Sequence, residues 1–599
     1  MQQDTLYTIS RFRGIREQAG FLPGPGDGEA STMENFALTD AGQLRLRPGL
    51  RPLLEGLTPS CSILGFWAGY AFGGEYLVLA VQQEARCRLI LHCSAGTTQT
   101  MDPFPGSAPR RVLFLPYDGG LYALTDQSYL RLTLSNGALT CQAVTGYVPL
   151  VLTNASPSGV GDPGESINML NDRRRIRYSG NGSSISYRLP PEAVEVLWVT
   201  VDGSASEFTF QNGSLLFSAP PQEGISNVEV CYRTGTSLLQ RLVQMRYTEL
   251  FSGPTHTHIL LYGDGSNQIL YSGVTNEGVA SAEYFPFDCV LRLGAGNSPI
   301  TGLIRHYSSL LAFQADGAWV IGAGSLPADN KGPDFTIRPL RAELGNEMPG
   351  QVKLVDNCPR TFSHGVLYDW TLPTGYYRNE RYTKPCGEAV QVSLRELDPN
   401  MAVAFDDDSL QTYYLFPGDG RALVHRYRQD SWYLYRSDAL INLLGAVRFG
   451  KEMILIRTND VLCWDWNTAY DQWGGTSAPI QARWVSGDLA FGKPTQKKYI
   501  RHLWLQLLPE PDSRLSVAAV ISGQGQCGCR STGAPTASYR AVHYGKWCYT
   551  WGRQIRTRRI HLPIRRFGSC RLEFRVTKPG ARATILGCSL KVLCAGELR

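Results

Sequence analysis

A strand-and-turn pattern that occurs twice between residues 412 and 465 constrains the fold more than any other feature of the sequence. Runs rich in aromatic and β-branched residues alternate with turn residues such as Gly, Asp and Asn. The runs are residues 413–416, 423–427 and 432–435 in the first copy, and 453–456 and 461–465 in the second. A sheet this small buries only one face and needs similar neighbours. Radial stacking of four-stranded sheets, as in a β-propeller, supplies them.

Looser copies of the same pattern occur upstream, at residues 76–81, 121–132, 310–321 and 365–370. At about 40 residues per blade, the pattern predicts six or seven blades. Composition agrees, because 62 Gly, 35 Pro, 29 Tyr and 12 Trp favour short strands and tight turns over helices. The predicted class is therefore all-β. A large irregular β-sandwich is the alternative to the propeller.

A chain of 599 residues is too long for one core and should form several domains. Between the blade-like segments lies an alternating, immunoglobulin-like segment that we interpret as a β-sandwich inserted into a propeller loop. The predicted divisions are an N-terminal arm (1–55), the first part of the propeller (56–150), the inserted sandwich (160–240), the second part of the propeller (241–480) and a C-terminal β-sandwich (481–599).

The net charge of +6 and pI near 8.5 are mild for this length and are not a nucleic-acid signature. Local clusters are more informative. The densest consists of Arg173, Arg174, Arg175 and Arg177, and a second one near the C-terminus spans residues 553–566. Either cluster could contact DNA phosphates or an acidic subunit surface, or form a solvated face. We take the first cluster as the candidate DNA or subunit contact.

No catalytic motif is present in the sequence. It lacks the GxxxxGK[ST], HExxH and GxSxG signatures, and residues 314–319 only partly resemble the sialidase box. His256 and His258 predict a strand-surface pair rather than a metal site, and residues 406–408 predict a solvated acidic turn rather than a calcium site. No catalytic residue, metal ion or cofactor is therefore expected.

Two segments bear on targeting and membranes. Residues 1–14 are polar and do not predict a secretory signal. Residues 61–81 are apolar, but glycines divide them into two strands around a turn, which argues against a membrane span.

The 15 scattered cysteines favour reduced thiols over a disulfide framework.

The N-terminal segment carries a recognisable combination of residues. It consists of Gly28, Glu29, Asn35, Gly42, Leu44, Arg47, Pro48 and Gly49. This pattern resembles the start of tail-hub or head-completion proteins of tailed bacteriophages, and most closely the packaged-DNA stabilisation proteins of short-tailed phages. Residues 147–171 and 261–286 resemble the same group. The resemblance spans most of residues 1–490.

The resemblance implies a non-enzymatic structural virion protein, made in the bacterial cytoplasm and assembled into the phage tail. Its partners would be itself in a homo-oligomeric ring, expected to be a hexamer, the head-to-tail adaptor or portal assembly, and other tail proteins. As a hub, nozzle or completion ring it would form or close the DNA channel, retain the packaged genome, and let DNA pass during ejection without sequence specificity. The alternative is a carbohydrate-binding or carbohydrate-degrading β-propeller, such as a host-attachment component.

Overall fold

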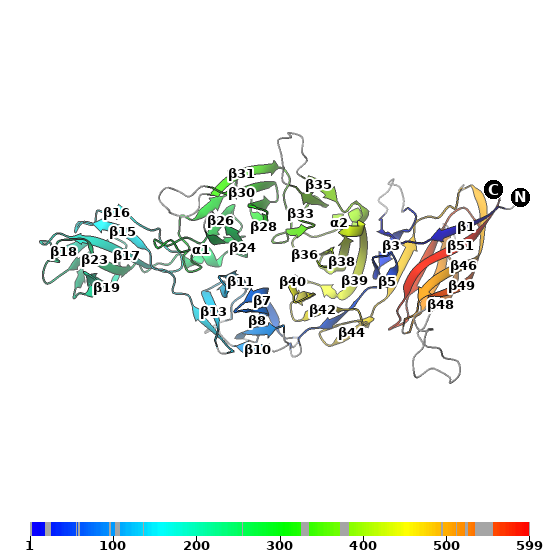
Figure 1. Ribbon diagram of the computed structural model, residues 1–599, viewed down its shortest axis with the longest axis horizontal. Coiled ribbons are helices and arrows are strands. Elements are labelled where there is room, and N and C mark those ends of the chain that lie inside the picture. The colour runs from blue at the N-terminus through cyan, green and yellow to red at the C-terminus, as the bar shows by residue number, and fades with distance from the viewer. Residues whose placement is uncertain are drawn as a thin grey trace. The chain divides into compact units, whose positions relative to one another are not determined.

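Figure 1 shows the computed structural model, in which almost every regular element is a β-strand. The structure describes residues 3–17, 26–54, 57, 60–84, 86–94, 98–101, 108–135, 137–253, 256–324, 335–371, 383–492, 495–510, 512–521, 525–533 and 555–597. The chain divides into two compact units. Unit 1 contains Met1–Cys61 and Gln351–Arg599, and unit 2 contains Ser62–Gly350.

Unit 2 contains four four-stranded antiparallel sheets that have the form of propeller blades. They are β7 (Ser62–Ala71), β8 (Gly74–Gln83), β9 (Arg86–Cys93) and β10 (Thr98–Met101); β11 (Val112–Tyr117), β12 (Gly120–Thr125), β13 (Tyr129–Ser135) and β14 (Ala138–Ala143); β24 (Tyr247–Ser252), β25 (Thr257–Tyr262), β26 (Gln268–Tyr271) and β27 (Val290–Arg292); and β28 (Ile300–His306), β29 (Ser309–Gln314), β30 (Gly317–Ala323) and β31 (Phe335–Ala342). The first strands of successive sheets contact one another, and each pair of neighbours shares a hydrophobic core. This is the radial stacking that the repeated pattern predicts.

Unit 1 contains three more four-stranded antiparallel groups of this kind, of which the first is a separate sheet and the other two are parts of a 10-stranded and a 6-stranded sheet. They are β32 (Lys353–Val355), β33 (Cys358–Ser363), β34 (Val366–Trp370) and β35 (Thr383–Cys386); β36 (Val403–Asp407), β37 (Thr412–Phe416), β38 (Asp419–Arg426) and β39 (Ser431–Ile441); and β40 (Leu443–Phe449), β41 (Glu452–Arg457), β42 (Val461–Asp465) and β6 (Gly49–Pro52). Strand β36 contacts both β32 and β40. The last sheet takes its fourth strand, β6, from the N-terminal segment.

These seven sheets confirm the all-β class and the β-propeller fold. Both copies of the pattern between residues 412 and 465 form the predicted strands. The predicted propeller parts were interpreted as one domain, whereas the compact units divide the blades four and three, between β31 and β32. Residues 76–132 and 410–465 consequently lie in different units.

The insert between the second and third blades of unit 2 is a β-sandwich. One sheet has the order β16 (Asp162–Pro163), β15 (Leu150–Ala155), β17 (Arg173–Gly180), β23 (Gly224–Arg233), β19 (Glu195–Val201) and β20 (Ser204–Ala205). The other has the order β18 (Ser186–Arg188), β22 (Ser214–Leu216) and β21 (Thr209–Gln211). Tyr178, Tyr187 and Val228 are among the residues of their shared core. Strand β17, which contains the Arg cluster, was not recognised as a strand from the sequence.

The C-terminal segment forms two sheets together with N-terminal strands. The first has the order β4 (Phe36–Leu38), β5 (Leu44–Leu46), β51 (Thr584–Glu597), β46 (Gln496–Leu508) and β49 (Arg556–Phe567), with β1 (Gln3–Ile9) also paired to β51. The second contains β45 (Ala482–Ser486), β50 (Cys570–Val576), β47 (Leu515–Ile521) and β48 (Gly525–Thr532). Strand β3 (Glu29–Glu34) joins this second sheet to β39 of a propeller blade.

The N-terminal segment therefore differs from the separate arm that its sequence predicts. Strand β1 pairs with β51, β3 with β45 and β6 with β42, so each lies in a sheet with strands from the C-terminal part of the chain. Local sequence patterns do not contain such pairings, because backbone hydrogen bonds between distant strands depend on register and not on residue type.

Candidate functional site

Two of the residues that carry the phage-tail resemblance, Asn35 and Arg47, lie in a buried polar network in unit 1. Arg47, between β5 and β6, is 2% exposed. Its guanidinium donates to both carboxylate oxygens of Asp471, at 2.8 Å to Oδ1 and 2.5 Å to Oδ2. Asp471 lies in β43 (Tyr470–Trp473), which forms a hairpin with β44 (Thr476–Pro479). The ion pair therefore joins positions 424 residues apart.

The remaining donors of Arg47 are also satisfied. Nε donates to Oδ1 of Asn35 at 2.8 Å, and the terminal nitrogens donate to the backbone oxygens of Pro48 at 2.9 Å and Arg436 at 3.1 Å. A buried charge is stable only when such partners replace water. This network is therefore complete without a ligand.

Asn35 links the same network to a third segment. Its φ of 59° is in the left-handed region, which Asn tolerates better than most residues. Its side-chain oxygen also accepts from the backbone N–H of Arg436 at 2.7 Å, and its amide donates to the backbone oxygen of Gln481 at 2.7 Å. Asn35 thus fixes the chain between β3 and β4.

The other motif residues have structural roles as well. A Cβ on Gly28, whose φ is +80°, would lie 2.3 Å from the backbone oxygen of Arg11, and one on Gly49 would lie 2.2 Å from that of Tyr470. Gly42 has a φ of +73° and likewise packs against Arg11. Leu44 is fully buried and Pro48 accepts from Arg47, while Glu29 accepts from the backbone N–H of Gly26 at 2.6 Å. The motif positions the N-terminal strands.

The Arg cluster of the insert is placed differently. Arg173, Arg174, Arg175 and Arg177 lie on β17, between β15 and β23. Arg175 and Arg177 both pair with Glu229 of β23, at 3.1 and 2.9 Å. The structure therefore brings these two together, while Arg173 is exposed at the start of the strand. Together with Glu192, which pairs with Arg174, Glu229 offsets two of the four positive charges expected for a DNA contact.

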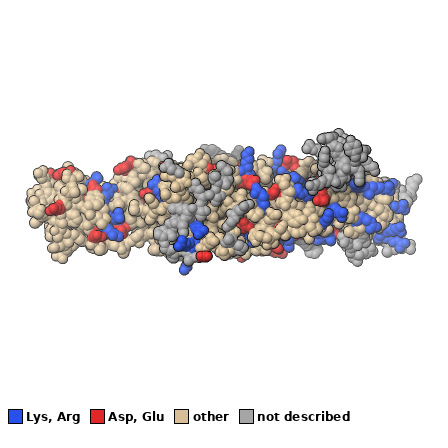
Figure 2. Space-filling model, turned by 90° about the horizontal axis from the view of Figure 1, so that it is seen from below, with Lys and Arg blue, Asp and Glu red and all other residues tan. Residues whose placement is uncertain are grey.

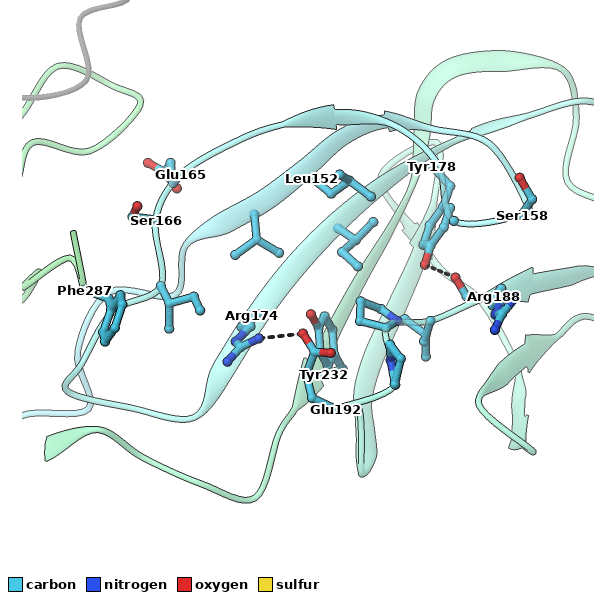
Figure 3. Close-up of a pocket in the computed structure, with 17 residues that line it drawn as sticks. Leu152, Ser158, Glu165, Ser166, Arg174, Tyr178, Arg188, Glu192, Tyr232 and Phe287 are labelled. Carbon is cyan, nitrogen blue, oxygen red and sulfur yellow. Dashed lines mark hydrogen bonds and ion pairs between the residues drawn. The ribbon is translucent and has the colours of Figure 1, made fainter. Parts of the chain in front are cut away.

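Arg174 lines a pocket of about 580 Å³ in unit 2, shown in Figure 3. Its guanidinium donates to Oε1 of Glu192 at 2.8 Å at one end of the pocket. Leu152, Ile167, Ile176, Phe287 and the pair Pro190-Pro191 are among the apolar residues of the lining. The pocket is thus an apolar depression with an ion pair at one end.

Glu165, also in the pocket lining, is held by three donors. Its carboxylate accepts from the hydroxyl of Tyr147 at 2.9 Å and from the backbone N–H groups of Leu150 at 2.7 Å and Asn276 at 2.6 Å. Burial and this hydrogen bond raise the pKa of Tyr147 to about 12. With Glu165 holding loops and Glu192 paired to Arg174, the pocket has the means to bind a ligand but presents no free carboxylate pair for acid–base chemistry.

The sequence singled out two histidines and three aspartates, and of these His258 and Asp407 are buried and have partners within the fold. His258 is buried, not on the strand surface as predicted, and its Nδ1 lies 2.6 Å from the backbone oxygen of Ser272. Burial lowers the pKa of His258. Asp407 is buried and pairs with Arg448 at 2.5 Å, so residues 406–408 are not simply a solvated turn. Among the described residues, no three His, Cys, Asp or Glu side chains are grouped to hold a metal ion.

The helices of the described segments are all too short to cross a membrane. No protein-family model matches the chain, and no curated protein sequence matches it.

Several solved structures are similar to this chain but distant from it in sequence. Virginiamycin B lyase from Staphylococcus aureus is 9% identical, with 69% of this chain and 97% of that chain covered and a TM-score of 0.33. A streptogramin B lyase is 8% identical, with 70% and 98% covered and a TM-score of 0.32. An exo-β-1,3-galactanase from Phanerochaete chrysosporium is 9% identical, with 57% and 95% covered and a TM-score of 0.22. Likenesses this weak carry no information about activity or ligands.

Sequence reasoning identified the motif residues but missed their main partner. Asp471 follows Tyr470 in an ordinary strand sequence, and no local signal connects it with Arg47. The partners of the Arg cluster were missed for the same reason, because Glu229 is 54 residues from Arg175 and 52 from Arg177.

Proposed function

We propose that this chain is a non-enzymatic structural subunit of a bacteriophage tail, in a hub, nozzle or head-completion ring that forms or closes the DNA channel and retains the packaged genome. The observation that carries the proposal is the buried network of Arg47, Asn35 and Asp471. Asn35 and Arg47, two of the residues that resemble phage tail proteins, hold the N-terminal strands among the C-terminal ones. For these two residues the resemblance concerns the packing of unit 1 and not an isolated turn sequence.

The way the termini are held suits such a role. Strand β1 pairs with β51 over seven residues, so the N-terminal and C-terminal strands lie in one sheet. Neither strand can leave without breaking backbone hydrogen bonds to the other. A subunit that stays in a particle while DNA moves past it needs this resistance to local unfolding.

The non-enzymatic part of the proposal rests on the side chains of the insert pocket. Glycoside hydrolysis uses two carboxyl groups free to act as acid and base or nucleophile. Here Glu165 accepts three hydrogen bonds from neighbouring loops and Glu192 pairs with Arg174. The carbohydrate-degrading alternative would have to place its chemistry elsewhere.

The proposal is tested on the purified full-length protein. Mass photometry and negative-stain microscopy should show a closed ring, expected to be sixfold, with a central opening. The same preparation should release no reducing sugar from a panel of β-linked oligosaccharides. A protein that stays monomeric at all concentrations and cleaves one of these substrates would contradict the proposal and favour the alternative.

A further inference from the structure

The charge of the chain is distributed very unevenly. Residues 481–599 contain 21 Lys and Arg against five Asp and Glu, a net charge of +16. The first 480 residues contain 37 basic and 47 acidic residues, a net charge of −10. The mild total of +6 therefore hides a strongly basic C-terminal segment. Such an asymmetry is the electrostatic footprint of a polyanion-binding region.

Part of this charge lies on the outer face of the sheet that contains β1, β51, β46 and β49. Buried positions alternate with exposed ones along β49, where Ile560, Leu562 and Ile564 are buried and Arg559, His561 and Arg565 are exposed. Arg501 is exposed at a bulge in β46, and Lys591 is exposed in β51. We call Arg501, Arg559, Arg565 and Lys591 the basic face.

Strand pairing places the cations of β49 beside outward side chains of β46. Trp504 of β46 pairs with Arg559, His502 with His561, and Tyr499 with Arg565. Neighbouring strands are about 4.8 Å apart, and successive residues on one face of a strand are about 6.8 Å apart. The cations are therefore spread over one face of the sheet.

The described charges of the basic face all have one sign. None of its described outward side chains is acidic, and Figure 2 shows Lys and Arg gathered at the end of the view where β46 and β49 lie. In the described part of the chain, Arg501, Arg559 and Arg565 form no ion pair. Arg559 donates to Nε2 of His502 at 2.6 Å, so that imidazole accepts and is neutral. Partial burial, followed by the nearby Arg559, lowers the pKa of His502.

This face contrasts with the Arg cluster of the insert. Arg174, Arg175 and Arg177 share the two carboxylates of Glu192 and Glu229, whereas Arg501, Arg559 and Arg565 form no ion pair among the described residues. Arg553, which the second sequence cluster also includes, lies outside the described residues. The C-terminal group is thus the better candidate for contact with an external anion.

We propose that the basic face binds the phosphate backbone of duplex DNA without reading its sequence. A polyanion matches a face whose described charges have one sign, whereas a complementary protein surface usually carries both signs and meets both. A sheet face also presents no helix or two-stranded ribbon that could enter the major groove. The inference rests on the proposed function for its setting, a ring through which DNA passes, but the binding itself can be measured on the isolated protein.

The test is fluorescence anisotropy of the full-length protein with labelled random-sequence duplexes of about 30 base pairs. With about four phosphate contacts, the slope of log K against log salt should be about −3.6, and the affinity should fall about 100-fold between 50 and 200 mM salt. Duplexes of different sequence should bind equally. Combining Arg501→Gln, Arg559→Gln and Arg565→Gln should make this slope shallower by about 3. It should also lower the affinity at 50 mM salt by more than tenfold.

A matched control removes the same charge elsewhere. Arg88, Arg292 and Arg338 are exposed in unit 2, and their triple Gln variant should bind DNA as the wild type does. The double variant Arg501→Gln/Arg565→Gln keeps the Arg559–His502 hydrogen bond and should make the slope of log K against log salt shallower by about 2. Thermal unfolding of each variant shows whether it is folded.

Three results would overturn the inference: no DNA binding at 50 mM salt, equal losses in the test and control variants, or binding of poly-L-glutamate in preference to DNA. The last would indicate an acidic protein partner. Negative-stain images of the same samples keep the two proposals apart. Rings without DNA binding would overturn this inference alone, whereas DNA binding by a monomer would count against the ring.

Discussion

The two arginine sites recognised in the sequence differ in what surrounds them. Arg47 in unit 1 is almost fully buried and donates to Asp471, Asn35 and two backbone oxygens. Arg175 and Arg177 in the insert are partly exposed and share one carboxylate, that of Glu229. The denser cluster in the sequence is therefore the one less integrated into the fold.

The comparison teaches that the number of arginines in a run says little about their role. A single arginine whose five N–H groups are all engaged fixes the chain in one arrangement. Exposed pairs gain little net energy, because water and salt screen them and ordering long side chains costs entropy. Mutations at the two sites should accordingly differ greatly in effect.

The largest effect is expected for Arg47→Met. The substitution leaves Asp471 buried without its partner and should lower the free energy of unfolding by about 3–5 kcal/mol in a urea titration. The double variant Arg47→Met/Asp471→Leu should cost less than the sum of the single changes, because both charges are removed.

Arg45→Met is the matched control for that experiment. Arg45 lies two residues earlier and stacks on Trp466 with 4.4 Å between the guanidinium carbon and the ring centroid. Its loss should cost about 0.5–1 kcal/mol. If Arg47→Met costs no more than Arg45→Met, the contrast between the two arginine sites is wrong.

A smaller effect is expected for Gly49→Ala beside the same network. The added Cβ would lie 2.2 Å from the backbone oxygen of Tyr470 and 2.5 Å from Cγ2 of Thr468, so β6 must move away from β43. We expect a loss of about 1–3 kcal/mol in the free energy of unfolding. Gly120→Ala is the control, since its nearest atom would be 3.4 Å away and the effect should stay within about 0.5 kcal/mol.

Asp406 is the opposite case to Arg47, because it is a partly buried carboxyl group without a matched donor. Its Oδ1 has no hydrogen-bond partner in the described structure, and burial followed by the nearby Asp408 raises the pKa of Asp406 to about 7. The folded state therefore holds a proton that the unfolded state releases near pH 3.8. The contribution of Asp406 to the free energy of unfolding should therefore be most favourable below that value and fall as the pH rises from 3.8 to about 7.

The measurement is the difference in melting temperature between wild type and Asp406→Asn across this pH range. The free energy of unfolding of the wild type should fall by about 1 kcal/mol relative to that of the Asn variant. This value includes a discount for the partial exposure of Asp406 to solvent. A difference that does not change with pH would mean that Asp406 has a donor after all.

The smallest effect is expected for Glu229→Gln in the insert. Losing its pairs with Arg175 and Arg177 should cost about 0.2–1 kcal/mol, and high salt should remove most of the difference. Glu223→Gln, at an exposed position of the same insert, is the control and should be neutral. A cost comparable with that of Arg47→Met would contradict the distinction between the sites.

The strands of the propeller could be predicted from sequence because their signals are local. The alternating apolar residues of β37, β38 and β42 and the turns between them lie within a few residues of one another. The partner of β6 could not be predicted, because the pairing of Leu50 with Trp464 depends on register across most of the chain. The N-terminal segment consequently looked like an arm.

The arginine sites, like the strands, could be predicted from sequence only where their signals are local. The motif identified Arg47 and Asn35, but the partners that explain them come from β43 and β39. In β17 the run of arginines concealed a strand, because only Ile176 and Tyr178 mark its buried side. The basic face was only partly visible in the sequence, because the cluster at 553–566 contains Arg559 and Arg565 but Arg501 and Lys591 join them only in the folded sheet.

The most direct test of the central claim is immunogold labelling of tailed phage particles from the lysed host with antibodies against this chain. The account predicts label on the tail, at the same position in every particle, and a fixed copy number consistent with a ring in quantitative mass spectrometry of purified particles. Label that is absent from the particles, with the protein found only in the particle-free lysate, would contradict the account.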